Sequence, residues 1–185
     1  AGVDITTELQ KAIDDKTIRV IELPAGEWEL SNSVNLNNMG GKVIKGQGEA
    51  TILKMKQGTN KPGFMSYSYA NLSNATFSDF QVDMNWSQGD SNVSGFQMTN
   101  ASFITWNNVG VRNSGGNGFV LQGYVTKDNA TGNGTSDCRL IQCTVHRAGL
   151  VQNPVEKGAS GFGILIKDES LRNQVINCVV REVSC

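Results

Sequence analysis

Alternating apolar and polar residues form a short pattern that recurs four times between residues 79 and 181. Each copy has an amide or acidic residue, an apolar residue, a variable residue, a valine, and then a charged residue or histidine. The copies are Asp79–Asp83, Asn108–Arg112, Gln142–His146 and Asn177–Arg181. Two apolar positions separated by one outward position are typical of a strand. A strand unit that returns at intervals of about 20–50 residues indicates a solenoid.

A second repeated element begins with the dipeptide Gly-Phe. Its copies are Gly95–Met98, Gly118–Leu121 and Gly161–Ile164. We expect the three phenylalanines to stack inside the solenoid, with Met98, Leu121 and Ile164 beneath the next sheet. We expect the glycines to turn the corner of the coil with φ values that a side chain disfavours. Each coil therefore has at least two strands, and a third is expected.

Residues 4–14 have the apolar spacing of a helix. Ile5, Leu9, Ala12 and Ile13 form one stripe, and Asp4 is the expected N-cap. Such a helix covers the open end of the first coil, whose apolar interior would otherwise face water. Short strands are expected between residues 18 and 55, whereas residues 64–76 are expected to form a loop.

Amide side chains should gather at one corner of the successive coils. Asn108, Gln142 and Asn177, with Asp79 in the first copy, occupy the same position of the pattern. Stacked amides hydrogen-bond along the axis of such structures, which is a structural role. Cys143 and Cys178 also share one position. Their side chains should stack inside the solenoid on strands about 4.8 Å apart, either as buried thiols or as a disulfide.

Composition narrows the class of partner. The 185 residues carry a net charge of −1, and 18% of them are charged. This balance gives no electrostatic reason to propose a nucleic acid or an anionic membrane as partner. No apolar run approaches the roughly 18 residues of a membrane span. With one histidine and no C-x-x-C pair, the sequence also gives no support for a zinc site.

Most of the chain resembles a known family, and the clearest motifs lie in its first third. The resemblance rests on the helix residues from Asp4 to Asp14, on Ile21–Trp28, and on Gly46-Gln47-Gly48 followed by Thr51-Ile52. These segments resemble the start of the pectate-lyase-like right-handed parallel β-helix superfamily, which includes polysaccharide lyases and hydrolases, mannuronan C5-epimerases and phage tailspike depolymerases. The resemblance implies an all-β solenoid, a single domain over residues 1–185, with an extracellular location, either secreted or on a virion surface. Because one fold hosts many functions, it says little about activity.

The chain ends at Cys185, directly after a strand copy. An uncapped last coil would expose apolar interior. We therefore expect that the chain continues in the native protein or that another subunit covers this end, as in a homo-oligomer or an end-to-end stack. Two insertions, residues 123–137 and 147–160, interrupt the repeat, and insertions of this kind often wall a binding groove.

The last position of the recurring pattern places Asp83, Arg112, His146 and Arg181 in one outward column. A histidine between two arginines has a depressed pKa, because like charges disfavour protonation. Neutral His146 is then a candidate base, while Arg112 and Arg181 hold the carboxylates of an acidic glycan. This is the chemistry of a lyase. The alternative is a solvated column in which Asp83 pairs with Arg112 and no catalysis takes place.

Other chemistries find less support in the sequence. In the epimerases that the chain resembles, the second Gly-Phe is followed by Asp-Pro-His-Glu, whereas Gly118-Phe119 is followed by Val120–Gly123. Epimerase activity by that mechanism is therefore not expected. Carboxylates do not stack on neighbouring strands as calcium-dependent lyases require, so no metal or other cofactor is expected. The aromatic candidates for sugar stacking are Trp86 and Trp106, with Tyr67, Tyr69 and Tyr124. Trp106 is either a packed corner residue or a surface residue.

Two functions follow from these observations. The first is a secreted or virion-associated protein that binds a polysaccharide and cleaves it in the manner of a lyase. Its candidate catalytic residues are His146, Arg112 and Arg181, and its candidate substrate-binding residues are Asp83, Trp86 and Tyr124. The second is a non-enzymatic β-helix that serves as a fibre, adhesin or receptor-binding shaft.

Overall fold

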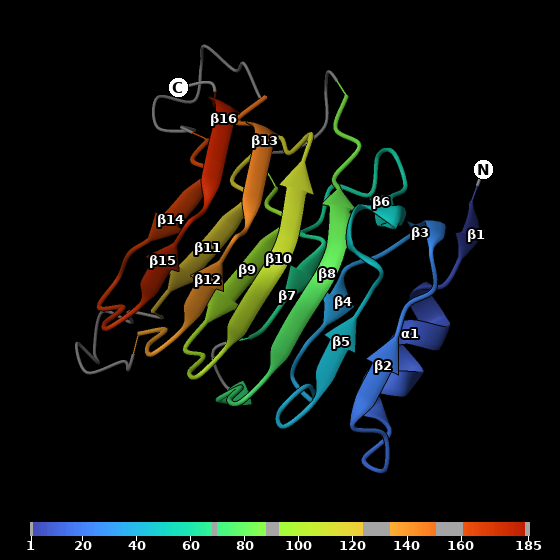
Figure 1. The fold of residues 1–185 in the computed structure, drawn as a ribbon, viewed down its shortest axis with the longest axis horizontal. Helices are drawn as coiled ribbons and strands as arrows, with labels where there is room; N and C mark the ends of the chain where they lie inside the picture. Colours follow the sequence, from blue (N-terminus) through green and yellow to red (C-terminus); the bar gives the residue numbers. More distant parts are fainter. Residues whose placement is uncertain (1, 68–69, 88–92, 124–133, 151–160, 184–185) are drawn as a thin grey trace.

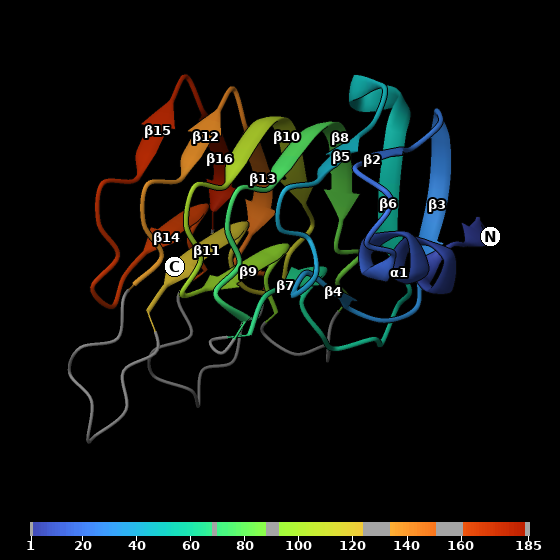
Figure 2. The same ribbon diagram turned by 90° about the horizontal axis from the view of Figure 1, so that it is seen from below.

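The recurring pattern becomes a right-handed parallel β-helix with three strands per coil (Figure 1). The computed structural model describes residues 2–67, 70–87, 93–123, 134–150 and 161–183. Within these residues the strands form two sheets, one of 11 strands and one of five. The coils stack from the N-terminal helix at one end to β15 and β16 at the other (Figure 2).

The larger sheet is bent and consists of two tracks. The first track contains β2 (Val20–Glu22), β5 (Val43–Lys45), β8 (Thr76–Asp83), β10 (Thr105–Arg112), β12 (Arg139–Ile141) and β15 (Gln174–Ile176). The second track contains β1 (Val3–Asp4), β3 (Gly26–Leu30), β6 (Thr51–Met55), the second halves of β8 and β10, β13 (Thr144–Ala148) and β16 (Val179–Val183). The smaller sheet contains β4 (Val34–Asn35), β7 (Phe64–Met65), β9 (Phe96–Thr99), β11 (Phe119–Gln122) and β14 (Ile164–Ile166). A short 3-10 helix, Gly48–Ala50, precedes β6.

The predicted amide corner separates the two tracks. Asp79, Asn108, Gln142 and Asn177 all have left-handed backbone, with φ between 51° and 59°. Asn and Asp adopt this conformation more readily than most residues because their short polar side chains bond locally. The Asn108 amide also donates to the Asp79 carboxylate over 2.9 Å. The corner is thus a column of turn residues, as predicted, and the predicted hydrogen bond along the axis is present between its first two members.

The core contains a ladder of stacked phenylalanines. Phe96 and Phe119 belong to it as predicted, whereas its third member is Phe64 and not Phe162. Phe64, Phe96 and Phe119 stack with centroids 4.8 and 5.2 Å apart and planes within 10°. Phe162 was expected to continue the ladder, but it is 41% exposed, and Ile164 pairs with Phe119 instead. Gly163 is therefore the glycine of that coil, two residues later than predicted. The prediction of a loop over residues 64–76 was wrong at its start, since Phe64 is buried in β7.

The glycines before these strands are required by space and not by φ. Gly95 and Gly118 do not have left-handed backbone, contrary to the prediction. A Cβ on Gly118 would lie 2.6 Å from both the Gly163 carbonyl oxygen and Val145 Cγ2. Val145 of the second track thus occupies the space that a side chain at Gly118 would need.

We expect Gly118→Ala to lower the free energy of unfolding by about 1–3 kcal/mol, because the extra methyl overpacks the core against backbone. Chemical denaturation measures this change. Gly40→Ala is the control, since the nearest atom to its Cβ, the Ser73 oxygen, is 3.2 Å away. Equal losses in the two variants would contradict the steric explanation.

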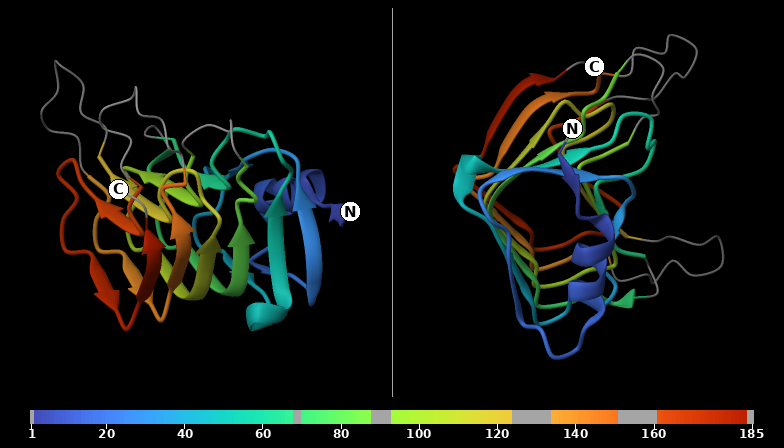
Figure 3. Two further views of the ribbon diagram at one scale, coloured as in Figure 1. Left: turned by 90° about the horizontal axis from the view of Figure 1, so that it is seen from above. Right: turned by 90° about the vertical axis from the view of Figure 1, so that its right-hand side faces the viewer.

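The N-terminal helix covers the opening of the first coil (Figure 3). Helix α1 spans Thr6–Asp14 and buries Leu9 and Ile13, so the predicted apolar stripe is confirmed. The helix begins two residues later than predicted, with Ile5 at the N-cap position. Asp4 still contributes, because its carboxylate accepts the Thr6 backbone N–H over 2.9 Å.

Buried Lys42 ties the far end of this helix to the second coil. Its ammonium donates to the carbonyl oxygens of Ile13 and Asp15, and the residue is only 3% exposed. The last carbonyls of a helix have no partner within the helix. Lys42 therefore satisfies groups that would otherwise be left unbonded at the junction between α1 and the coils.

The cysteines of the described residues are thiols. Cys138, Cys143 and Cys178 are free, so Cys143 and Cys178 do not form the disulfide that the sequence left open. Burial raises the pKa of the Cys138 thiol to about 11 and that of Cys143 to about 12. Cys185 lies outside the described residues.

The last coil presents apolar side chains at its outer end. Val175, Val179 and Val180 are 47%, 41% and 44% exposed. The expectation that further chain or another subunit covers this end stays a prediction. Among the described residues, no helix is long and apolar enough to cross a membrane.

Candidate functional site

The four residues of the predicted column lie side by side on the second track. Arg112 pairs with Asp83 on one side and His146 on the other, and His146 pairs with Arg181. The column continues toward the N-terminus through Lys54, Glu29 and Asp4. Neighbouring members come from parallel strands about 4.8 Å apart. A row of charged side chains therefore runs along the axis of the β-helix.

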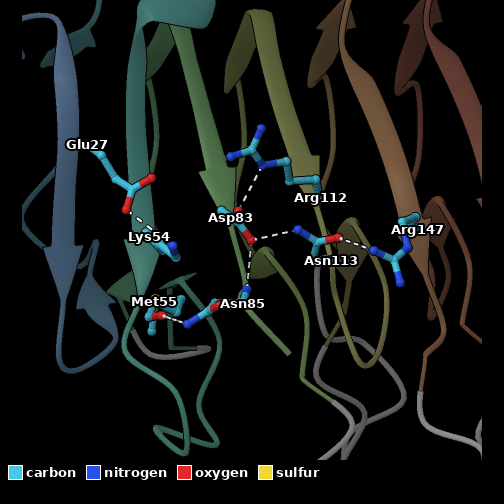
Figure 4. Close-up of polar contacts among 8 residues, drawn as sticks. All are labelled: Glu27, Lys54, Met55, Asp83, Asn85, Arg112, Asn113 and Arg147. Atoms are coloured by element: carbon cyan, nitrogen blue, oxygen red, sulfur yellow. Dashed lines mark hydrogen bonds and ion pairs between the residues drawn. The ribbon is translucent and has the colours of Figure 1, made fainter. Parts of the chain in front are cut away.

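Asp83 is the most buried member of this column. Its side chain is 8% exposed, and Arg112 Nε donates to it over 2.9 Å. Asn113 Nδ2 and the backbone N–H of Asn85 donate to the other carboxylate oxygen, each over 2.9 Å (Figure 4). Asn113 in turn accepts from Arg147 over 3.2 Å. With both of its oxygens engaged inside the protein, Asp83 is placed to orient Arg112.

Arg112 keeps part of its guanidinium free. Its side chain is 37% exposed, and among the described residues only its Nε forms a hydrogen bond. In Figure 4 the two terminal nitrogens of Arg112 point away from Asp83. Such a fork, fixed at Nε, presents donors in the geometry that matches a carboxylate.

His146 has an acidic partner that the sequence reasoning missed. Its Nε2 lies 3.2 Å from a Glu182 carboxylate oxygen, and the two side chains are 50% and 66% exposed. Glu182 follows Arg181 and has left-handed backbone, with φ of 53°. A carboxylate beside one ring nitrogen fixes the tautomer and leaves the other nitrogen as an acceptor. The environment of His146 thus differs from that predicted, which considered the two arginines alone.

The aromatic candidates are not part of this column. Trp106 is fully buried and packs against Phe77 and Phe96, so it belongs to the core and not to a sugar-binding surface. Trp86 is partly buried, and its backbone N–H donates to the Asn113 carbonyl oxygen over 3.1 Å. Tyr124 lies outside the described residues, as do most of the two insertions that were expected to wall a groove. Their predicted roles therefore stay predictions.

Neither a metal cluster nor the epimerase motif appears in the described residues. No three His, Cys, Asp or Glu side chains of that part of the chain gather where they could hold a metal ion. Val120 and Leu121, which stand where the epimerases have the aspartate and the proline of their motif, are 4% and 0% exposed. Gln122 follows and donates to Thr99 over 3.2 Å.

A second surface, which the sequence reasoning missed, lies where the first-track strands β10, β12 and β15 begin. We call it the Phe103 groove and define it by Phe103, Asp137, Arg139, Arg172 and Gln174. It consists of two adjoining hollows of about 630 and 880 Å³, which share Phe103, Asp137 and Arg172. Ligand-binding clefts in proteins typically have volumes of about 300–1,000 Å³.

Phe103 has an unusual backbone for its residue type. It has a φ of 54° and its side chain is 57% exposed. The residues beside it in the adjacent coils, Asn74 and Asp137, share this conformation but tolerate it better. For a bulky residue the left-handed region costs about 1–2 kcal/mol. A sequence signal for this position exists. When Ser73-Asn74, Ser102-Phe103 and Ser136-Asp137 are aligned before successive strands, Phe103 falls at a position that Asn and Asp occupy in the other two coils.

Opposite charges meet next to this ring. Arg172 donates from Nε and Nη2 to the two Asp137 oxygens, both over 2.7 Å. These hydrogen bonds from Arg172 lower the pKa of Asp137 below its ordinary value. Arg139 lies two residues after Asp137 and is exposed. Its side chain forms no hydrogen bond or ion pair with the described residues.

Comparison with known proteins shows the fold. No family model and no curated protein matches the sequence. Three solved structures are similar: ORF18 of Geobacillus virus E2, the A-module of mannuronan C-5 epimerase AlgE4 from Azotobacter vinelandii, and the catalytic domain of a GH87 α-1,3-glucanase in complex with nigerose.

Sequence identity to these structures is 16%, 19% and 20%, with TM-scores of 0.58, 0.57 and 0.56. They cover 95%, 94% and 99% of this chain, which spans 39%, 47% and 34% of theirs. The chain is thus less than half the length of each of these structures. These similarities confirm the parallel β-helix fold that the sequence indicated.

Proposed function

We propose that this β-helix, whose structural neighbours include an epimerase module and a glucanase domain, acts outside the cell on an acidic polysaccharide. The polymer lies along the outer face of β10, β13 and β16. Cleavage follows the lyase route, with His146 as the base. Arg112 and Arg181 hold the uronate carboxylates, and Asp83 and Glu182 position Arg112 and His146.

The observation that carries this proposal is the set of contacts around His146. The ring lies in register between two arginines, its Nε2 is 3.2 Å from Glu182, and half of its side chain is open to solvent. With its proton on Nε2, the nitrogen beside Glu182, the ring has a free lone pair on Nδ1. A base that is oriented by a third group and flanked by cations has the parts needed to remove a proton beside a carboxylate.

The reaction breaks two bonds in one uronate residue. His146 Nδ1 takes the proton from C5, whose acidity increases when Arg112 or Arg181 neutralises the adjacent carboxylate. The electrons of the C5–H bond form the C4=C5 double bond, and the C4–O4 bond breaks. The leaving oxygen takes a proton from water, and the hydroxide that remains takes the proton back from His146, which regenerates the base. The products are a new chain end with a hydroxyl and an unsaturated uronate.

The unsaturated product absorbs in the ultraviolet, which gives a direct assay on a panel of acidic polysaccharides. We expect His146→Ala to lower the rate by about 100-fold or more, the usual contribution of a general base. Arg112→Gln and Arg181→Gln should raise KM, because they remove contacts with the substrate carboxylates. Lys54→Ala is the control, since Lys54 belongs to the same column but lies three coils from His146.

Equal rates for wild type and His146→Ala would show that another group is the base. A folded wild-type protein that binds the polymer but releases no unsaturated product would exclude the lyase reaction. That result would favour the non-enzymatic alternative, an adhesin or receptor-binding shaft.

A further inference from the structure

We infer that the Phe103 groove is a second carbohydrate-binding site, which takes one uronate residue of an acidic polysaccharide. The choice of an acidic polysaccharide as ligand rests on the proposed function. The groove itself contains none of the residues that the proposed reaction uses. The column of Arg112 and the groove lie at opposite ends of β10, since Thr105 at its start lines the groove.

The Phe103 ring is the exposed apolar member of a column of left-handed corner residues that also contains Asn74, Asp137 and Arg172. Its backbone is in the left-handed region, and more than half of the side chain is exposed. Residues kept in a costly conformation gather at functional sites. The open ring is a flat apolar surface, which is the shape that packs against the C–H face of a sugar ring.

Asp137 and Arg172 supply fixed polar groups beside the ring. Two hydrogen bonds of 2.7 Å hold the pair in one geometry. The hydrogen bonds from Arg172 lower the pKa of Asp137 further below neutrality, so the carboxylate stays in its charged form. Each of its oxygens has further lone pairs, so the carboxylate can also accept hydrogen bonds from sugar hydroxyls.

Arg139 selects for a charged sugar. Its neighbours in register are Thr105 and Gln174, both uncharged. Among the described residues its guanidinium has no carboxylate partner, whereas Arg172 is paired with Asp137. An exposed, unpaired arginine matches a carboxylate in a bidentate manner. Over both hollows the charges balance, Arg139 and Arg172 against Asp137 and Glu169. The positive charge that is left without a carboxylate partner is local to Arg139, at the end of the groove away from Glu169.

Phe103→Asn separates a binding role of the ring from a structural one. Asparagine stands at the equivalent position of the preceding coil and tolerates positive φ. We expect the variant to lose about tenfold or more in affinity for a galacturonate hexamer, measured by isothermal titration calorimetry. We also expect its Tm to rise by about 2–4 °C, since relief of the strained backbone stabilises the fold. Phe103→Tyr, which keeps a ring, should retain binding.

Arg139→Gln tests the charge of the ligand. It should lower the affinity for the hexamer by about tenfold, and have little effect on the same hexamer with its carboxylates reduced to alcohols. Arg19→Gln, which removes an exposed arginine near the first coil, is the charge-matched control. Equal affinity of wild type for the two hexamers would exclude a uronate-specific site.

The titrations use the His146→Ala background, so that no cleavage occurs during the measurement. Binding that depends on Phe103 and Arg139 in a protein without lyase activity would uphold this inference while the proposed reaction fails. Unchanged affinity in Phe103→Asn, with Tm raised, would overturn the inference. Lost affinity in both Phe103→Asn and Phe103→Tyr would also overturn it, because the ring would then not be the contact.

Discussion

Phe96→Ala is expected to lower the free energy of unfolding by about 3–5 kcal/mol, the usual loss when a buried phenylalanine is truncated. Phe96 is 0% exposed and stacks between Phe64 and Phe119. It also meets Phe77 and Trp106 edge to face, at 5.5 and 5.9 Å. The change leaves a cavity shared by three coils, which cannot collapse without moving the strands. Denaturant titration followed by circular dichroism measures the loss.

Phe162→Ala is the matched control for the phenylalanine ladder. The side chain is 41% exposed, so its removal should change stability by less than about 1 kcal/mol. If Phe162 belonged to the ladder, as the Gly-Phe repeat suggested, the two variants would be similarly destabilised. The pair of measurements therefore tests the register of the fifth coil as well as the energy of the core.

Asp83→Ala is expected to lower the free energy of unfolding by about 3 kcal/mol. The substitution removes the acceptor for Arg112, Asn113 and the Asn85 N–H. Breaking a buried ion pair from one side costs about 3–5 kcal/mol, and the partial exposure of Arg112 places this case at the lower end. Thermal and chemical denaturation give the value.

Lys54→Ala removes a comparable but exposed pair in the same column. Lys54 and Glu27 are 3.2 Å apart, with 35% and 45% of their side chains exposed. Exposed pairs contribute about 0–1 kcal/mol, so this variant should be nearly as stable as wild type. A double-mutant cycle between Asp83 and Arg112 isolates their coupling. A coupling near zero would mean that Asp83 stabilises the coil through Asn113 and Asn85 alone.

The sequence was most informative where burial imposes a strict period. The valines and apolar residues of the recurring pattern predicted the second track and its register, because a shift by one residue would turn the whole strand inside out. The amide corner followed from the same alignment. The Gly-Phe repeat misled in the fifth coil, since Gly161-Phe162 lies two residues before Gly163-Ile164, the true counterpart.

Features that depend on contacts across the interior were not visible in the sequence. The sequence suggested that Gly95 and Gly118 are needed for an unusual φ. The structure shows instead that Val111 and Val145, which lie opposite them, leave no space for a side chain. Glu182 was missed as a partner of His146 because it stands outside the recurring pattern. The Phe103 groove was missed because exposed positions obey no period, and only an alignment of the residues before each first-track strand places Phe103 beside Asn74.

The short separation of paired strands along the sequence has a consequence for synthesis. Paired residues on neighbouring strands are 23 to 45 residues apart in the sequence. Val20 and Val43 are an example of the shortest separation, and Phe119 and Ile164 of the longest. Once α1 and Lys42 have left the ribosome, the first coil can close before the rest of the chain exists. Each later coil then docks on a finished template, so folding proceeds from the N-terminus at the pace of translation.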